Sequence, residues 1–277
     1  MFNDEVQSAK RFSGRTEPFM VRVMNETGNP SPGPPKNPII VIPSRLASTR
    51  LPDKPLADIH GLPMIVHVWR RAVEADAGPV IVACADFRII DTIKDAGGDA
   101  IYTNPDHASG SDRVFEAMHT VDPQKKHDCV INLQGDLPTI DPDSVKASLR
   151  PLSDAAVDIA TLVSPITDEA ERDDPNVVKA VLSMADGDST GRALYFSRAA
   201  VPSSGTLYHH IGLYAFRRDA LDRFVKLPRG ELERQESLEQ LRALEAGMRI
   251  DAERVDTVPL GVDTPADLER ARELLAP

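Results

Sequence analysis

Long apolar runs are absent from this sequence of 277 residues, and cysteine is scarce. No stretch of about 18 apolar residues occurs, so we expect no membrane-spanning helix. The two cysteines, Cys84 and Cys129, lie in apolar, strand-like segments. This placement favours two buried small side chains over a disulfide framework or a zinc site.

Positive charge is also in short supply, because 32 Lys and Arg stand against 43 Asp and Glu, a net charge of −11. Nucleic-acid binding needs a basic face that neutralises phosphates. The composition therefore argues against a nucleic-acid partner, and a site for an anion has to be local.

The remaining composition is that of a globular chain, with 41% hydrophobic and 27% charged residues. Residues 1–37 have scattered arginines, no continuous apolar segment of a secretory signal, and a stretch rich in Gly, Asn and Pro toward their end. We expect residues 1–37 to form a flexible N-terminal extension and residues 38–277 to form one domain, since that length fits a single large α/β domain.

Strand-like and helix-like segments alternate in the first half of this domain. Short apolar runs at 39–42, 80–83, 100–102 and 129–133 are separated by helical patterns at 63–75, 86–96 and 111–120. Such an order predicts a mainly parallel sheet with helices on both faces. Ligands bind beyond the carboxyl ends of strands in these sheets, so the loops after residues 42, 83, 102 and 133 are expected to converge.

The second half is less regular. Residues 157–163, 177–182 and 211–216 are typical of strands, and residues 232–246 have the pattern of one amphipathic helix. A last helix is predicted over 264–275, with Thr264 as its N-cap and Pro265 at its first position.

A basic loop follows the first strand and carries Arg45, Ser48, Thr49, Arg50 and Lys54. Cations and hydroxyls in an irregular loop with exposed backbone N–H groups are typical of a polyphosphate site. The alternative is an ordinary solvated loop. Neither the P-loop pattern nor the dinucleotide-binding glycine pattern fits this segment.

These residues resemble the 3-deoxy-manno-octulosonate cytidylyltransferases, also called CMP-Kdo synthetases. The resemblance covers roughly residues 39–275 and consists of ordered blocks. They read RLASTRLPDKPL, HASGSDR, INLQGDLP, ALYFSR, HHIGLYAF, ESLEQLRALEAG and GVDTPADLERAR.

The resemblance implies a three-layer α/β nucleotide-diphosphosugar transferase fold, which is Rossmann-like. It also implies transfer of CMP from CTP to the acidic sugar 3-deoxy-manno-octulosonate (Kdo), with release of pyrophosphate. Mg²⁺ is the expected cofactor, and the product serves lipopolysaccharide synthesis. Family members are usually homodimers, and we expect a cytoplasmic enzyme.

The resemblance also assigns roles to the basic loop and the motifs that follow it. Arg45 and Lys54 are expected to hold the triphosphate during catalysis, and Asp136 and Asp263 to bind the metal. A lone Asp at a strand end is otherwise a turn former, and Asp263 could instead support the N-cap of the last helix. The nucleotide-binding set is Arg45, Ser48, Arg50, Lys54, His107, Ser109, Gly110 and Gln134.

The expected sugar-binding residues are Arg113, Gln134, Arg198, His210, Tyr214, Glu236 and Gln240. A guanidinium suits the carboxylate of the sugar, and amides and carboxylates suit its hydroxyls. Glu236 and Gln240 are four residues apart on the predicted helix 232–246, so they would reach the same pocket. His210 could equally be a buried structural histidine. The sequence identifies no general base.

The chain departs from the family pattern at two positions near these motifs. Leu137 stands where Glu is usual, and Asp53 stands where Gly is usual. The first change removes a charge near the expected metal, and the second adds an anion beside Lys54. Two alternatives therefore stay open. The chain could activate a related acidic sugar, of the sialic-acid type or an 8-amino Kdo analogue, or bind nucleotide without turnover.

Overall fold

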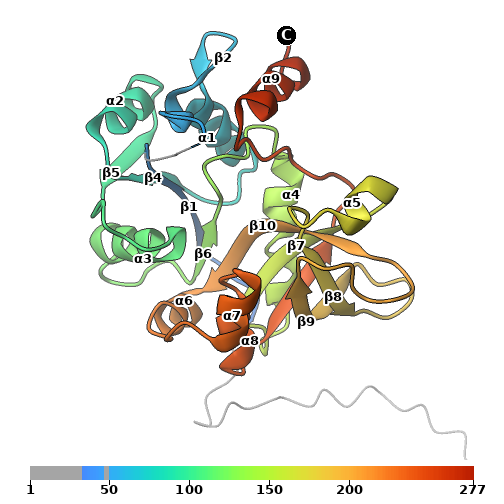
Figure 1. The fold of residues 1–277 in the computed structure, drawn as a ribbon. Coiled ribbons are helices and arrows are strands. Elements are labelled where there is room, and N and C mark those ends of the chain that lie inside the picture. Colours follow the sequence, from blue (N-terminus) through green and yellow to red (C-terminus); the bar gives the residue numbers. More distant parts are fainter. Residues whose placement is uncertain (1–32, 47–49) are drawn as a thin grey trace, which may run out of the picture. The chain divides into compact units, whose positions relative to one another are not determined.

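A nine-stranded sheet organises the part of the chain that the computed structural model describes, which is residues 33–46 and 50–277 (Figure 1). The strand order is β5-β4-β1-β6-β10-β7-β11-β9-β8, and β2 and β3 form a separate small hairpin. The strands are β1 (Pro38–Ser44), β2 (Asp58–Ile59), β3 (Leu62–Pro63), β4 (Val80–Cys84), β5 (Asp99–Tyr102), β6 (Cys129–Asn132), β7 (Ile159–Pro165), β8 (Lys179–Ser183), β9 (Thr190–Ser197), β10 (Tyr208–Arg217) and β11 (Ile250–Arg254).

The first half of the sheet agrees with the sequence prediction. β5, β4, β1 and β6 are parallel neighbours. Helices α1 (Met64–Glu74), α2 (Phe87–Asp95) and α3 (Gly110–Val121) connect them. The continuous apolar runs of these strands fit burial on both faces.

The sheet as a whole is mixed, so the prediction of a mainly parallel sheet is not confirmed. β10 is antiparallel to β6, β7 and β8, and β9 is antiparallel to both β8 and β11. For β8 and β9 the reason is that no helix separates these two paired strands. Consecutive strands that pair without a crossover run in opposite directions.

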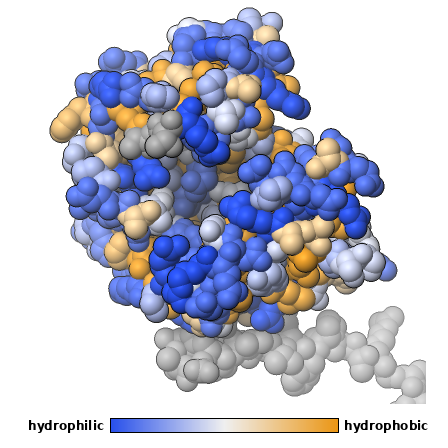
Figure 2. All heavy atoms as spheres, viewed as in Figure 1, coloured by the Kyte–Doolittle hydropathy of each residue, from blue (hydrophilic) through white to orange (hydrophobic). Residues whose placement is uncertain are grey.

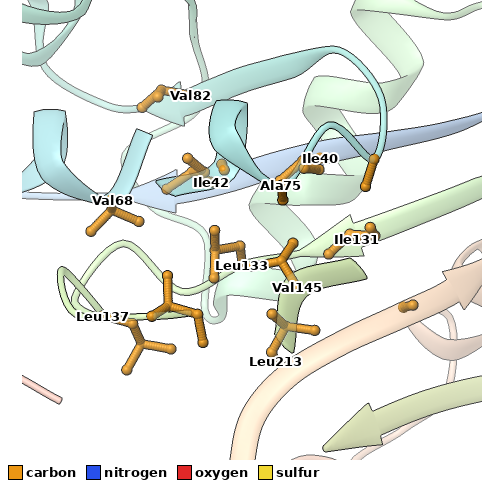
Figure 3. Close-up of a cluster of buried hydrophobic side chains, with 14 of the residues drawn as sticks. Ile40, Ile42, Val68, Ala75, Val82, Ile131, Leu133, Leu137, Val145 and Leu213 are labelled. Carbon is orange, nitrogen blue, oxygen red and sulfur yellow. The ribbon is translucent and has the colours of Figure 1, made fainter. Parts of the chain in front are cut away.

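Helices cover both faces of the sheet, as the three-layer prediction requires. Along β1, Ile40 and Ile42 belong to one core cluster, with residues of α1, α2 and α4 (Pro142–Ala147), while Ile39 and Val41 belong to a second cluster. Helices α3, α6 (Arg218–Phe224) and α8 (Leu241–Glu245) pack on that second side. Figure 3 shows the first cluster, with Ile40, Ile42 and Ile131 of the sheet near Leu133 and Val145.

The helix predicted over residues 232–246 is two helices, α7 (Glu231–Glu236) and α8. Ser237 ends α7 with φ 55°, in the left-handed region that stops a helix. The turn lets Arg242 of α8 fold back onto Glu233 of α7, with donor–acceptor distances of 2.7 and 2.8 Å. Glu236 and Gln240 therefore do not share one helix face, and that prediction is wrong.

The last helix, α9 (Pro265–Leu274), begins as predicted with Thr264 as N-cap and Pro265 at its first position. Its apolar side packs with Ile59 and Met64, beside the β2–β3 hairpin. A short helix α5 (Glu169–Asp173) and two 3-10 helices, η1 (Lys54–Leu56) and η2 (Arg150–Ser153), complete the described elements. No helix in the described ranges is long and apolar enough to cross a membrane.

Residues at the end of the expected extension contact the domain. The backbone N–H groups of Lys36 and Asn37 donate to the carboxylate of Asp128, at 2.8 and 2.9 Å. The guanidinium of Arg217 donates to the carbonyl oxygen of Gly33 at 3.1 Å. The docked part of the chain therefore begins by residue 33, ahead of the boundary predicted at residue 37. The rest of the extension, residues 1–32, lies outside the described residues.

Candidate active site

A cavity of about 660 Å³ opens at the carboxyl ends of β1, β5 and β6. Figure 2 shows this face of the molecule hollowed, with mostly hydrophilic residues around the hollow. Three of the four loops expected to converge contribute to it, while the loop after β4 contributes no lining residue. The lining residues are Pro43, Ser44, Arg45, Arg50, Lys54, Pro55, His107, Ser109, Gly110, Arg113, Gln134, Gly135, Asp136 and Asp263.

Lys54 joins the two predicted metal ligands. Its Nζ lies 2.9 Å from Oδ2 of Asp136 and 3.0 Å from Oδ1 of Asp263. The two carboxylate oxygens can be no farther apart than the sum of these distances, about 6 Å. Arg50 pairs with the other oxygen of Asp263 at 2.9 Å. Residues far apart in the sequence thus form one network of two cations and two carboxylates.

The carboxylates set the charge state of Lys54. Burial lowers the pKa of the Lys54 ammonium, but the negative charge of Asp136 and hydrogen bonds to Asp136 and Asp263 outweigh burial, so the pKa of Lys54 is raised. Lys54 is therefore a full cation at neutral pH.

The loop before Lys54 explains one departure from the family pattern. Asp53 has φ 52°, a left-handed conformation that glycine adopts freely and Asp tolerates better than most residues. Its carboxylate accepts two hydrogen bonds from Arg88, both at 3.2 Å. The anion expected beside Lys54 is thus bound by a different cation.

The position of Asp136 depends on a close backbone approach at Gly135. A Cβ atom at residue 135 would lie 2.8 Å from the carbonyl oxygen of Pro43, which is too near for any side chain. The carbonyl oxygen of Asp136 also accepts a hydrogen bond from the N–H of Val262 at 3.0 Å. This bond ties the segment after β6 to the segment that carries Asp263.

Asp263 is held by the start of α9. Its N–H donates to the carboxylate of Asp267 at 3.1 Å, and Asp267 and Thr264 form a reciprocal capping box. The carboxylate of Asp263 remains free of the cap and faces Lys54 and Arg50. The alternative role considered for Asp263, N-cap support, therefore falls to Thr264 and Asp267.

Two arginines of the cavity have no ion-pair partner among the described residues. Arg45 is exposed at its rim, and Arg113 is buried, donating to Oγ1 of Thr103 at 2.6 Å and to the carbonyl oxygen of Asn104 at 3.1 Å. Burial, and then the charge of Arg45, lower the pKa of Arg113. Two neighbouring guanidinium groups that form no ion pair with a described carboxylate are well suited to an anion.

Four residues of the HASGSDR segment, His107, Ser109, Gly110 and Arg113, line the cavity. Ser109 is the N-cap of α3, two residues before the helix start expected at Ser111. His107 pairs with Glu116, a contact that sequence reasoning missed because the two residues are nine positions apart. Gln134 donates to Oδ1 of Asn132 at 3.1 Å, which orients its amide.

Ser44 is a lining residue that the sequence analysis did not single out. It is buried at the end of β1, and its hydroxyl has no hydrogen-bond partner within the described residues. Its place directly before Arg45 in the basic loop was the available signal. Ser48, predicted for nucleotide binding, lies outside the described residues.

The remaining predicted sugar-binding residues do not line this cavity. Arg198 donates to the carbonyl oxygens of Glu236 and Pro175, at 3.1 and 2.9 Å. The carboxylate of Glu236 accepts hydrogen bonds from Ser197 Oγ at 2.9 Å and from the N–H of Arg198 at 3.0 Å. Both side chains are thus engaged in joining β9 to the end of α7.

His210 of β10 is buried, and Tyr214 of the same strand is half-buried. The Nε2 atom of His210 lies 3.0 Å from Oγ1 of Thr161, and burial lowers the pKa of His210 to about 3, so its ring is neutral. Burial raises the pKa of Tyr214 above its usual range. Tyr214 and Gln240 line a second cavity of about 10 Å³, beside Ser111 of α3. The Nε2 atom of Gln240 has no partner among the described residues.

Leu137, the second departure from the family pattern, is part of the hydrophobic core. Only 8% of it is exposed, and Figure 3 shows it below Leu133 and beside the apolar cluster. The residue after Asp136 therefore anchors that segment by apolar packing and supplies no charge to the cavity.

The carboxylate pair fits a magnesium ion better than a metal held by protein alone. Among the described residues, no group of three or more His, Cys, Asp or Glu side chains could hold a metal ion. Mg²⁺ commonly takes one or two carboxylates and completes its shell with phosphate oxygens and water. Asp136 and Asp263, about 6 Å apart or less, match that pattern.

Comparisons with known proteins agree with this geometry. The cytidylyltransferase family profile matches residues 39–250. The 3-deoxy-manno-octulosonate cytidylyltransferase of Paramagnetospirillum magneticum is 63% identical over 239 residues, which are 86% of this chain and 97% of that protein. The protein of the same name from Rhodospirillum centenum is 64% identical over 88% of this chain and 95% of its own length.

A solved structure is also similar. A CMP:2-keto-3-deoxy-manno-octonic acid synthetase complexed with CTP matches with a TM-score of 0.80 and 43% identity, over 87% of this chain and 99% of that chain. Since the matches in sequence and structure span nearly all of the described domain, this chain belongs to the 3-deoxy-manno-octulosonate cytidylyltransferase family.

Proposed function

We propose that this protein transfers CMP from CTP to Kdo, giving CMP-Kdo and pyrophosphate. The observation that carries the proposal is the cavity beyond β1, β5 and β6, where four basic side chains and two carboxylates converge. The names of the relatives and the CTP complex of the similar structure support the choice of substrates.

The reaction joins two negatively charged molecules, so its main demand on the protein is charge neutralisation and positioning. The anomeric hydroxyl oxygen of the sugar bonds to the α-phosphorus of CTP, while the bond from that phosphorus to the oxygen bridging to the β-phosphate breaks. Pyrophosphate leaves with this bridging oxygen, and the hydroxyl proton is lost to solvent. In this proposal Arg45, Arg50 and Lys54 hold the triphosphate, and Ser48 adds a hydroxyl.

The other lining residues have matching tasks. His107, Ser109, Gly110 and Gln134 border the nucleotide. Arg113 and Gln134 extend toward the sugar. Asp136 and Asp263 would hold a magnesium ion, which, when bound, supplies neutralisation of phosphate charge. No residue is proposed as general base.

Selection of the sugar falls to Arg198, His210, Tyr214, Glu236 and Gln240 in this proposal. They lie outside the main cavity, but Tyr214 and Gln240 border the small second cavity together with Ser111 of α3. The Nε2 atom of Gln240, which has no partner among the described residues, could donate to a sugar hydroxyl. A rearrangement of α7 and α8 would be needed to admit the sugar there.

A pyrophosphate-release assay with CTP and a panel of acidic sugars tests the proposal. We expect release with Kdo at a kcat/KM well above that with a sialic acid or 8-amino Kdo. A higher kcat/KM with either analogue would show that this analogue, and not Kdo, is the preferred substrate. CTP binding without release for any sugar would identify a nucleotide-binding protein without turnover.

Variants of the carboxylate pair test the site itself. Asp136→Asn and Asp263→Asn should each remove most turnover, and the double variant should be little worse than either, because residues that act as one unit are not additive. Asp219→Asn, which removes an exposed carboxylate beside Lys125, is the matched control and should leave turnover unchanged. Additive losses in the double variant would contradict a shared site.

The family also suggests where this protein acts and how it assembles. We expect a cytoplasmic homodimer whose product enters lipopolysaccharide synthesis. Sedimentation of the purified chain at several concentrations checks the dimer, and a single species with the mass of one chain throughout would refute it.

A further inference from the structure

Lys54 occupies the position between Asp136 and Asp263 that a divalent cation would need. Its ammonium contacts one oxygen of each carboxylate, at 2.9 and 3.0 Å. We propose that Lys54 is an internal cation that keeps divalent metal off these two carboxylates until the phosphates of a nucleotide draw the ammonium away. The inference rests on the proposed function for the identity of the nucleotide and the metal.

The charges of the four side chains balance. Asp136 and Asp263 carry two negative charges, and Lys54 and Arg50 carry two positive charges in direct contact with them. Mg²⁺ and Mn²⁺ are hard cations that bind anionic oxygens, and Mg²⁺ in particular dehydrates reluctantly. A carboxylate pair that is already neutralised offers such an ion little attraction. Metal alone should therefore bind weakly.

Lys54 can leave this position by rotation of its side chain alone. The backbone on either side is fixed, because Arg88 binds Asp53 with two hydrogen bonds and Pro55 is buried at the start of η1. The lysine side chain is a flexible four-carbon stem with a compact charge, which suits a movement of a few ångströms.

The cavity also contains cations that would bring phosphate close enough to draw the ammonium of Lys54 away. Arg45 and Arg113 line the same cavity and form no ion pair with any described carboxylate, so they are available to a phosphate chain at the start of binding. A triphosphate brought there carries several negative charges and competes with the carboxylates for the ammonium of Lys54. Once the ammonium turns to phosphate, Asp136 and Asp263 are free to bind metal. Nucleotide should thus bind before metal or together with it.

Direct measurement of Mn²⁺ binding without nucleotide tests the inference, since bound Mn²⁺ loses its free-ion electron paramagnetic resonance signal. We expect the wild-type chain to bind Mn²⁺ weakly, and Lys54→Met to bind it at least about tenfold more tightly at one site. Lys54→Met combined with Asp136→Asn should return to the wild-type affinity. Wild-type and Lys54→Met affinities within about threefold of each other would overturn the inference.

Lys125 provides a matched control, because its Nζ also bridges two carboxylates, Asp219 at 3.3 Å and Asp222 at 2.7 Å, away from the cavity. Lys125→Met should not gain a tight Mn²⁺ site. An equal gain in Lys125→Met would show a general effect of removing a lysine and would count against a role for Lys54. Lys54→Gln, which keeps a polar side chain, guards against a folding defect in Lys54→Met, and it should show the same gain.

The order of binding gives a second readout. Calorimetry of the metal-free wild-type chain should detect CTP binding, and Mn²⁺ affinity should rise at least about tenfold when CTP is present. In Lys54→Met, the effect of CTP on Mn²⁺ affinity should be much smaller, because the metal site is already open. An equal effect of CTP in both proteins would overturn the inference.

These measurements are independent of the proposed reaction. If no acidic sugar supports pyrophosphate release but Lys54→Met gains the Mn²⁺ site, the proposed function fails and the role of Lys54 stands. If CMP-Kdo forms but Mn²⁺ affinity is the same with and without Lys54, the reverse holds.

Discussion

Replacement of Gly135 by alanine tests how closely the sheet edge beside the candidate site is packed. The added Cβ would lie 2.8 Å from the carbonyl oxygen of Pro43 and 3.3 Å from Cδ1 of Ile65, against 3.4 Å at the near limit of an ordinary contact. The methyl group therefore lacks about 0.6 Å of space toward the backbone. Pro43 belongs to the central strand β1, so most of this movement falls on the segment of Gly135 and Asp136.

The expected loss can be estimated from this overlap. Overpacking of a well-packed interior costs about 1–3 kcal/mol of unfolding free energy. For a domain of this size, 1 kcal/mol lowers the melting temperature by about 2–4 °C. We therefore expect Gly135→Ala to melt about 2–12 °C lower than wild type.

Activity should fall by more than stability implies. A displacement of Asp136 by about half an ångström or more disturbs its contact with Lys54 and its distance from Asp263, and misplacement by about 1 Å can cost about a hundredfold in rate. We expect kcat/KM for CTP to drop at least about tenfold at a temperature where the variant is fully folded.

Gly212→Ala is the matched control, because Gly212 lies in β10 and a Cβ atom added there would meet no atom within 4 Å beyond its chain neighbours. It should melt within about 2 °C of wild type, as expected for substitutions without a steric conflict. Thermal unfolding followed by circular dichroism and the pyrophosphate assay measure both effects. A Gly135→Ala protein with wild-type melting temperature and wild-type kcat/KM would refute the packing argument.

Two further predictions concern α7 and the chain before β1. Burial raises the pKa of Glu233, but hydrogen bonds from Arg242 and the charge of Arg242 outweigh burial, so the pKa of Glu233 is lowered. The ionised Glu233 therefore stabilises the fold above the unfolded pKa of about 4.3. This stabilisation is lost as pH falls through the folded pKa. Glu233→Gln should thus melt well below wild type at pH 7, with a difference that shrinks below about pH 4, and a difference independent of pH would contradict this. Deletion of residues 1–32 should leave activity and melting temperature nearly unchanged. Deletion of residues 1–37 should instead lower the melting temperature by several degrees. The reason is that the hydrogen bonds of Lys36, Asn37 and Gly33 to the domain contribute roughly 1 kcal/mol each. Equal melting temperatures of the two truncated chains would show that this segment adds nothing.

The sequence predicted the parallel half of the sheet because its strands are buried on both faces and appear as continuous apolar runs. β11 escaped prediction because it contains two buried acidic residues, Asp251 and Glu253. Arg249 pairs with Asp251, and Arg150 pairs with Glu253. These partners, one of them about a hundred positions away, let charged residues occupy a central strand, and no local pattern reveals them.

The candidate site also combines features that local sequence patterns predict with features that only the folded chain creates. Local signals placed the basic loop, the segment 134–136 after a strand, and Thr264 as an N-cap correctly, since each depends on neighbouring residues. The contact of Lys54 with Asp136 and Asp263 depends on three segments that meet only in the folded chain. The break between α7 and α8 also depends on a contact between helices, that of Arg242 with Glu233, so the helical pattern alone predicted one continuous helix.

The two carboxylates and the three cations of the candidate site are held by different parts of the fold. Asp136 follows a core strand, is followed by buried Leu137, and is tied by its carbonyl oxygen to Val262, while Asp263 is fixed by the capping box of α9. Arg45, Arg50 and Lys54 instead belong to the loop after β1, and Arg45 and Arg50 are exposed. In the proposed reaction, the two carboxylates would hold a metal ion beside the α-phosphate, and the long basic side chains would adjust to a substrate whose charge changes. In the proposed function, an acidic protein would attract two anionic substrates because four of its basic side chains line one cavity at the edge of the sheet.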